Sequence, residues 1–470
     1  MRAQPKWSVW ATPALVAALV FALEAASLSA WLALPLFGVA LLHASSATGA
    51  LFAPGERRLT QVGALGGAAG VVVALVAAPF VGFGTALLLI VTSLFGGWGA
   101  GRSALEFEPF TEGVPEPSTS PSLAAKVAVD ELILGFEQVQ GTMGYPLDGT
   151  IERVIREIDE MHRFLDAGDR LARPADYHEA PPPLADPEIT TRTIRGQKVE
   201  VLRFESGYAP PHGAPGRARW GAVDACRDAF AYVLRHEGGA RPWVIATNGY
   251  RMGHAAIDVG LFGRFHAAGG LGANVLIPVL PLHGPRSPSW HSGTGFLGID
   301  VIRTIHAESQ ALWDMRRLLS WIQAQGAPPV GAFGLSLGGF TTANFASLAE
   351  GLACAVPGIP LADVHRMLLR HGAGPQLEYA KQIGFSTDRI RDILRVVSPL
   401  ALEPKVPRNG RMLFGATADR LVTPDQVRDL WRHWEEPEIV WYQGSHISFT
   451  NERAVWDGVD RTFREAGVAD

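Results

Sequence analysis

Residues Val330–Asn344 read V-G-A-F-G-L-S-L-G-G-F-T-T-A-N, and this stretch decides the fold that we expect. A short apolar run, typical of a buried strand, ends in G-L-S-L-G and passes at once into a segment that can be helical. In such a strand–turn–helix, G-x-S-x-G places its serine on a sharp, strained turn, and the small glycines leave room for it. The backbone N–H of Leu337 would then point to where an oxyanion forms. Ser336 is therefore a candidate nucleophile. The alternative is an ordinary loop rich in glycine and serine.

Two candidate partners of Ser336 follow later in the chain, each just after a predicted strand. Arg411–Ala416 is typical of a buried strand, and Asp419 lies in the loop behind it. Glu438–Tyr442 predicts the next strand, and His446 follows it. Open α/β sheets place their active sites at the carboxyl ends of strands, so we expect these side chains to lie there. His446 would take the proton from Ser336, and Asp419 would orient the imidazole. Alternatively, His446 is only a polar loop residue.

A second acid, Asp425, follows the same strand as Asp419. It comes directly after Thr423-Pro424, a pair that commonly opens a helix. An acid in the first turn of a helix interacts favourably with the helix dipole. Because Asp425 has this structural role available, the sequence favours Asp419 as the acid.

With this order of serine, acid and histidine, the chain resembles the α/β-hydrolase superfamily from about Ile189 to the C-terminus. The resemblance implies a mostly parallel sheet with helices on both faces, and a serine hydrolase of the esterase or lipase type. It also implies that the loop after the strand Trp243–Thr247 donates a second N–H to the oxyanion hole, from Tyr250 or Arg251. The His-Gly pair that is common at this place in the family is missing here, since the loop begins N-G-Y-R.

The interval between the strand Leu352–Val356 and Arg411 is too long for a bare loop. In the family this interval commonly carries a helical cap over the active site, and we expect one over residues 358–400, with an ordinary packing insertion as the alternative. Its predicted helices are Leu361–His371, Leu377–Ile383 and Thr387–Val397, and the residues that could line an apolar underside are Met367, Leu368, Leu369 and Phe385.

Other segments of residues 189–470 alternate between strand and helix patterns, which implies a mostly parallel α/β sheet. We expect a β-hairpin at Ile189–Ile194 and Val199–Phe204, a helical run from the loop Ala209–Gly216 to about His236, a strand at Asn274–Leu280 and a helix at Ile299–Gln323. His283 and Arg286 follow the strand at 274–280 and are possible pocket residues. The alternative is a rigid loop with a surface arginine.

Two blocks that are nearly free of charge, Trp7–His43 and Val62–Trp98, open the chain. Each is longer than the ~20 residues that one spanning helix needs, and shorter than two full spans with a loop. We expect two helical hairpins within residues 1–105, four spans in all, with two long spans as the alternative. The residues that could turn the chain near the middle of each block are Glu24, Ser27 and Ser29 in the first, and Pro79, Gly82 and Gly84 in the second.

Basic residues at three places predict the orientation of these spans. Arg2 and Lys6 precede the first block, Arg57 and Arg58 lie between the blocks, and Arg102 follows the second. With four spans all three places fall on one side, which the positive-inside rule puts in the cytoplasm. We therefore expect a multi-pass protein of the cell membrane whose C-terminal domain is cytoplasmic.

Between the membrane region and the catalytic domain we expect a Pro- and Ser-rich linker over residues 106–122 and a helical connecting segment over 123–188. The latter contains apolar stripes at helical spacing over Leu123–Gln140 and Thr150–Leu165.

The overall composition narrows the function classes. A net charge of −5 gives no sign of a nucleic-acid partner, and the two cysteines have neither a disulfide framework nor metal-ligand spacing. No metal or cofactor motif is present. Membrane attachment favours a lipophilic, small-molecule or lipid-like acyl ester as the substrate. A thioesterase or a prolyl-oligopeptidase-like peptidase on the same fold stays open, and so does a non-enzymatic membrane scaffold.

Overall fold

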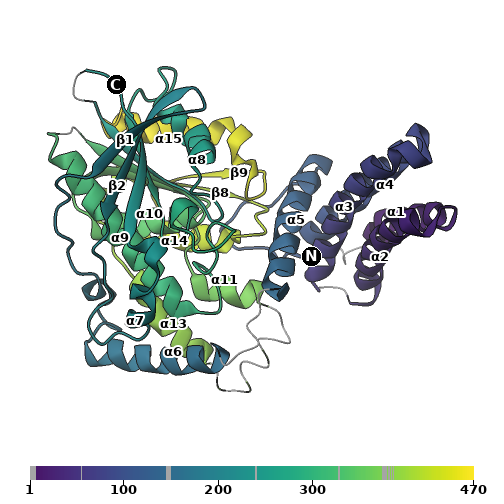
Figure 1. Ribbon diagram of the computed structural model, residues 1–470, viewed down its shortest axis with the longest axis horizontal. Helices are drawn as coiled ribbons and strands as arrows, with labels where there is room; N and C mark the ends of the chain where they lie inside the picture. The colour runs from purple at the N-terminus through teal and green to yellow at the C-terminus, as the bar shows by residue number, and fades with distance from the viewer. Residues whose placement is uncertain are drawn as a thin grey trace. The chain divides into compact units, whose positions relative to one another are not determined.

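The structure is a computed structural model of the chain (Figure 1). It describes residues 7–53, 56–143, 150–238, 241–326, 329–372, 378, 382, 384 and 386–469. Arg2 and Lys6, most of the predicted helix Leu377–Ile383 and Phe385 lie outside the described residues.

The chain forms two compact units that do not follow its linear order. The first contains Met1–Tyr145, Ala416–Asp425 and Trp441–Glu452. The second contains Pro146–Gly415, Gln426–Val440 and Arg453–Asp470. Asp419 and His446 therefore belong to the same unit as the N-terminal helices, whereas Ser336 belongs to the other.

Four long apolar helices make up most of the first unit: α1 (Trp7–Ala26), α2 (Ala30–Phe52), α3 (Arg58–Val81) and α4 (Phe83–Phe107). Each contains a stretch long and apolar enough to cross a membrane. The turn between α1 and α2 lies at residues 27–29, and α3 ends at Gly82, which has a φ of 81°. Both breaks fall where the sequence predicts them, so the prediction of four apolar helices in two hairpins is confirmed.

Many small residues lie inside this bundle, together with a few large ones such as Phe21 and Leu36, and many large apolar residues lie outside. A Cβ atom added to Gly67 of α3 would lie 3.0 Å from the backbone of Gly97 in α4, so the two helices need glycine for their close approach. Large side chains such as Leu23, Leu34 and Val76 are exposed. This pattern suits helices that face lipid on their outer side. A fifth helix, α5 (Pro121–Met143), packs against α3 and α4.

The main sheet has nine strands in the order β1-β2-β3-β5-β4-β6-β7-β8-β9. The first three neighbouring pairs are antiparallel, and the next four pairs, from β5 to β8, are parallel. The exchange of β4 and β5 in the order means that the chain crosses over between parallel neighbours. The strands are β1 (Glu188–Ile194), β2 (Gln197–Glu205), β3 (Asp228–Leu234), β4 (Trp243–Thr247), β5 (Asn274–Val279), β6 (Val330–Leu335), β7 (Leu352–Gly358), β8 (Met412–Ala416) and β9 (Glu438–Tyr442).

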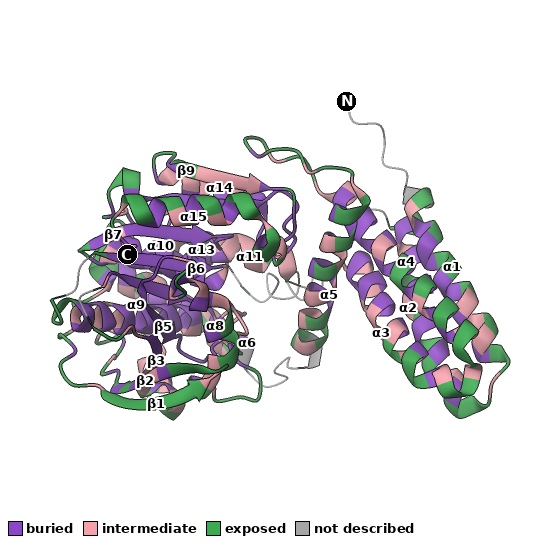
Figure 2. Ribbon diagram, turned by 90° about the horizontal axis from the view of Figure 1, so that it is seen from above, coloured by how far each residue is buried: buried purple, intermediate pink, exposed green. Residues whose placement is uncertain are grey.

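Helices cover both faces of this sheet, as β6 demonstrates. Successive side chains of a strand point to opposite faces. Phe333 packs against Phe265 and Trp456, at ring-centroid distances of 5.0 and 6.1 Å, whereas a Cβ on the next residue, Gly334, would meet Thr342 in α10. In Figure 2, β5, β6 and β7 are buried along their length. The predicted α/β-hydrolase fold is confirmed.

The remaining helices are α6 (Thr150–Ala167), α7 (Arg217–Gly221), α8 (Ala255–Phe262), α9 (Val301–Gln323), α10 (Leu337–Leu348), α11 (Val364–His371), α13 (Thr387–Leu394), α14 (Pro424–His433) and α15 (Arg453–Glu465).

One predicted element is wrong. The helical run expected up to about His236 ends after the short α7, and residues 228–234 form strand β3 instead. Strand β3 pairs with β2 on one side and β5 on the other, and five of its seven residues are buried. A strand buried on both faces reads as a continuous apolar run and loses the alternation that would identify it.

The two segments predicted to connect the membrane and catalytic regions have different neighbours. Helix α5 packs against the apolar helices, whereas α6 packs against α9 and α13. Helices α11 and α13, in the predicted cap interval, contact each other. The boundaries of the domains and a cap function for this interval stay predictions.

Candidate functional site

Ser336 lies on the sharp turn between β6 and α10. Its φ of 57° and ψ of −114° are unfavourable for a residue with a side chain, and the surrounding backbone holds it there. Its N–H donates to the carbonyl oxygen of Gly358 (3.0 Å), and its own carbonyl accepts from Phe340 (3.0 Å) and Leu361 (3.3 Å). A Cβ atom on Gly338 would collide with the backbone of Thr247. Ser336 is half-buried between buried neighbours, so the turn has the geometry that the pentapeptide predicts.

Helix α10, which begins at Leu337, is braced from behind by a buried acid on α9. Glu308 accepts hydrogen bonds from the Thr341 hydroxyl (2.8 Å) and from the Asn344 amide (3.0 Å). Burial raises the pKa of Glu308 to about 8, although both hydrogen bonds lower it. The side chain therefore holds α10 while largely uncharged at neutral pH.

The loop with the predicted second oxyanion donor runs beside Ser336. A Cβ atom on Gly249 would lie 3.8 Å from that of Ser336. The loop turns tightly, since the Met252 N–H donates to the Gly249 carbonyl (3.2 Å) and Arg251 has a φ of 68°. The Arg251 guanidinium is held by the Thr294 hydroxyl (2.9 Å). The loop is thus next to the serine, and the roles of Tyr250 and Arg251 stay predictions.

Asp419 and His446 form a buried pair in the first unit, hereafter the acid–histidine pair. Asp419 Oδ2 lies 2.6 Å from His446 Nδ1. The other oxygen, Oδ1, accepts from the backbone N–H of Leu421 (2.9 Å) and of Val422 (2.8 Å), which fixes the carboxylate. This leaves Nε2 as the ring nitrogen directed away from the acid, as proton transfer requires. Asp425 lies in the first turn of α14, as predicted.

A third acid, which sequence reasoning missed, contacts both loops of the pair. Asp130 of α5 is fully buried, and its Oδ2 accepts from the backbone N–H of His446 (2.9 Å) and of Arg420 (3.1 Å). Its Oδ1 has no partner among the described residues. Asp130 and Glu131 interrupt an apolar stretch of a helical pattern, and this interruption was the available signal.

The charges of these groups shift one another's pKa values. Burial lowers the pKa of His446, but the Asp419 charge, the hydrogen bond that His446 donates to Asp419 and the Asp130 charge together raise it above its ordinary value. Burial and the Asp419 charge raise the pKa of Asp130 to about 7. Both shifts favour keeping a proton within the cluster.

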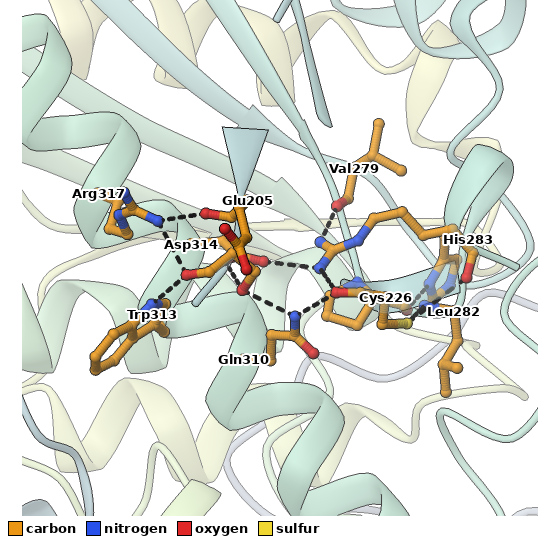
Figure 3. Close-up of polar contacts among 12 residues, drawn as sticks. Glu205, Cys226, Val279, Leu282, His283, Gln310, Trp313, Asp314 and Arg317 are labelled. Carbon is orange, nitrogen blue, oxygen red and sulfur yellow. Dashed lines mark hydrogen bonds and ion pairs between the residues drawn. The ribbon is translucent and has the colours of Figure 1, made fainter. Parts of the chain in front are cut away.

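Arg286 is part of a buried cluster, so the alternative of a surface arginine is wrong, whereas its role in a substrate pocket stays a prediction. Its guanidinium donates to the Val279 carbonyl (2.9 Å), to the Cys226 carbonyl (3.3 Å) and to Asp314 Oδ2 (2.9 Å). Figure 3 shows Asp314 and Gln310 of α9 gathered with Cys226 and Val279 in this cluster. A buried ion pair of this kind fixes α9 against the end of β5.

His283 is also buried, and it lies beside the loop after β4 that contains Tyr250. Its Nδ1 donates to the Pro281 carbonyl (2.9 Å), and its ring lies edge-on to Tyr250 at a centroid distance of 6.1 Å. Its Nε2 has no partner among the described residues. Burial lowers the pKa of His283 to about 4, so the ring is neutral at physiological pH. A contact with substrate stays a prediction.

A cavity of about 540 Å³, a volume that includes open solvent, lies between α10 and the helices of the 358–400 interval. Its lining is more polar than the apolar underside that we predicted, and Met367, Leu368 and Leu369 are not part of it. The residues that line it include Phe340, Asp363, His365, Leu394, Arg391 and Arg395. The described residues contain no group of three histidines, cysteines or acids arranged to hold a metal ion.

Comparison with known proteins identifies close relatives of the chain. Two uncharacterised proteins of Mycobacterium tuberculosis, from strains CDC 1551 and H37Rv, are each 38% identical to it over 354 residues, 74% of this chain and 84% of theirs. No protein-family model matches the chain. Among solved structures, it aligns with acetyl xylan esterase 1 from Thermoanaerobacterium at 15% identity, covering 64% of this chain and 93% of the esterase (TM-score 0.46). It also aligns with an acetyl xylan esterase from Paenibacillus at 11% identity, covering 64% and 99% (TM-score 0.42).

Proposed function

The chain belongs to the family of these two mycobacterial proteins and has the α/β-hydrolase fold, and from this premise we propose that it is a membrane-anchored serine hydrolase that cleaves a carboxylic ester. The observation that carries the proposal is the strained backbone of Ser336 at the end of β6. A non-glycine residue keeps a positive φ only where the surrounding structure holds it there, and such strain clusters at active sites. The acid–histidine pair supports the same reading, because Asp419 orients His446 and leaves Nε2 for proton transfer.

In the proposed mechanism, Ser336 Oγ attacks the acyl carbonyl carbon while His446 Nε2 takes the hydroxyl proton. The N–H of Leu337, together with that of Tyr250 or Arg251, stabilises the oxyanion. When the tetrahedral intermediate collapses, the carbon–oxygen bond of the ester breaks, and His446 returns its proton to the leaving alcohol. Water, deprotonated by His446, then attacks the acyl-enzyme and releases the acid.

The substrate that we propose is a lipophilic or lipid-like acyl ester, because the first unit contains four helices able to cross a membrane. Thioesters and peptides can undergo the same acyl transfer. A panel of acyl esters of increasing chain length, matched thioesters and peptide amides would separate these classes. The proposal requires esters to give the highest kcat/KM, and a preference for peptide amides would contradict it.

A fluorophosphonate probe tests the nucleophile on the full-length protein in detergent. We expect one covalent adduct, which mass spectrometry should locate on Ser336. An intact protein that takes up no probe at Ser336 would favour a non-enzymatic membrane scaffold.

We also propose that the N-terminus and the hydrolase fold face the cytoplasm, across an even number of spans. Reporter fusions at positions 1, 57 and 470 should all report the cytoplasmic side. Position 57 alone on the other side would mean two long spans, and position 470 outside would contradict the orientation.

A further inference from the structure

Helix α5, which follows the apolar helices in the chain, supplies one acceptor to both loops of the acid–histidine pair. Asp130 Oδ2 accepts the N–H of His446 itself and the N–H of Arg420, the residue directly after Asp419. Both amides are buried, and a buried N–H without an acceptor is costly, so they constrain the loops to lie around this one oxygen. Two backbone hydrogen bonds also join the loops directly, from the Thr417 N–H to the Tyr442 carbonyl (3.0 Å) and from the Ala418 N–H to the Gly444 carbonyl (3.1 Å). Asp130 adds a shared acceptor next to Asp419 and at His446 itself.

Asp130 is in turn held by a network of charges that reaches the start of the third apolar helix. Its neighbour Glu131 is fully buried and pairs with Arg420 Nε at 2.7 Å. Thr60, in the first turn of α3, donates its hydroxyl to the other oxygen of Glu131 (2.6 Å). Arg420 also pairs with Glu108, directly after α4. The acid loop is thus fastened to α3, to α5 and to the end of α4.

The histidine loop has its own contacts with the same region. Lys126, one helical turn before Asp130, donates to the Gln443 carbonyl (3.2 Å) and pairs with Glu452 (2.8 Å). The Gln443 side chain bonds to the backbone of Glu116 (3.0 Å) and Ser118 (2.7 Å). Part of the stretch predicted as a linker, residues 106–122, therefore contacts the histidine loop.

We infer that Asp130 is a positioning residue for the acid–histidine pair, and that the membrane region acts through it and through Arg420 as a structural part of the catalytic machinery. The catalytic part of this inference rests on the proposed function, whereas the structural part does not. The physical reason is that proton transfer requires accurately placed groups. A displacement of about 1 Å in a catalytic group can cost about 10²-fold in rate.

Hydrogen–deuterium exchange tests the structural part without an activity assay. In the full-length protein in detergent, Asp130→Ala should speed exchange at the Arg420 and His446 amides by about tenfold or more, because both lose their acceptor. Glu137→Ala, on the same helix and with the same loss of charge, should leave both amides as in the wild type. Unchanged exchange at both amides in Asp130→Ala would overturn the inference.

If Asp130→Ala does not fold, Asp130→Asn decides the question. At pH 8, above the pKa of Asp130, a neutral amide oxygen accepts weaker hydrogen bonds than a carboxylate. Exchange at the two amides should then rise together by a smaller factor while the rest of α5 keeps its protection. No change at either amide would overturn the inference here too.

Activity tests the catalytic part. Asp130→Ala should lower kcat by about 10²-fold with KM unchanged, and Asp130→Asn should recover most of that loss, because it restores an acceptor. Normal kcat in a folded Asp130→Ala protein whose amides exchange faster would overturn the positioning role. Ser336→Ala is assayed in parallel: if it kept full turnover, the proposed function would fail, while the exchange result would still decide whether Asp130 holds the loops.

Discussion

Ser336 and the acid–histidine pair are held in place by different kinds of structure. The turn around Ser336 is fixed by residues close to it in sequence and by the strands beside it, through Gly338, Phe340 and Gly358. The pair is held by backbone bonds between and within its two loops and also by Asp130, which lies 316 residues before His446 in the chain. The serine turn is held by its own motif and the neighbouring strands, whereas the two loops of the pair share an acceptor supplied by a distant part of the chain. The part of the proposed site that a sequence motif reveals is thus also the part that is held locally.

The largest effect on kcat should come from replacing Ser336, whose turn is held locally. Ser336→Ala should lower kcat for an activated ester by about 10⁶-fold, the loss given for the serine of subtilisin. Helix α10 and its brace at Glu308 do not involve the Ser336 hydroxyl, so the melting temperature should stay near that of the wild type. A folded variant with most of its esterase activity would remove Ser336 from the site.

A smaller effect on kcat is expected in the acid–histidine pair, from replacing Asp419, the acid proposed to orient the histidine. Asp419→Asn should lower kcat by about 10⁴-fold, as when a protease triad loses its acid in this way. Asp425→Asn is the matched control, because Asp425 lies in the first turn of α14. It should cost at most about 1 kcal/mol of stability and leave kcat near normal. The reverse pattern would make Asp425 the catalytic acid.

The smallest effect concerns pH and tests whether the pair titrates as a buried unit. The pKa of His446 is raised above its ordinary 6.5, and catalysis needs the neutral imidazole, so kcat/KM should rise with pH with an apparent midpoint above 6.5. Because the pKa of His446 is higher in the folded protein than in the unfolded chain, protonated His446 stabilises the fold below pH 6.5. This contribution to the free energy of unfolding is lost as the pH rises through the pKa of the folded state. Asp130, with a pKa of about 7, titrates in the same window, so the midpoint belongs to the cluster.

Two measurements check this pH dependence. Rates between pH 6.5 and 8 (roughly the upper half of the range in which His titrates) should increase while the melting temperature of Ser336→Ala falls. A midpoint below 6.5, or rates and stability that rise together, would contradict the assigned environment of His446.

The sequence predicts the features whose causes are local. The elbow at Ser336, the four apolar helices and the strands before Asp419 and His446 all leave a pattern within a few residues. Strand β3 was missed because burial on both faces removes its alternation. The role of Asp130 depends on a contact between the first and last thirds of the chain, and the burial of Arg286 depends on Asp314 in another element. Contacts of this kind leave no local period, so one sequence does not reveal them.

The distance along the chain between Asp130 and the loops that it holds has a consequence for biosynthesis. During translation, the apolar helices and α5 leave the ribosome long before the residues around His446 are made, because synthesis proceeds from the N-terminus. Asp130 then has neither of its two amide donors, and Arg420 is not yet there to pair with Glu131. A nascent chain that already contains the serine turn still has no oriented histidine. If the proposed function holds, the protein therefore stays inactive until its last segment is released and folds back onto the first.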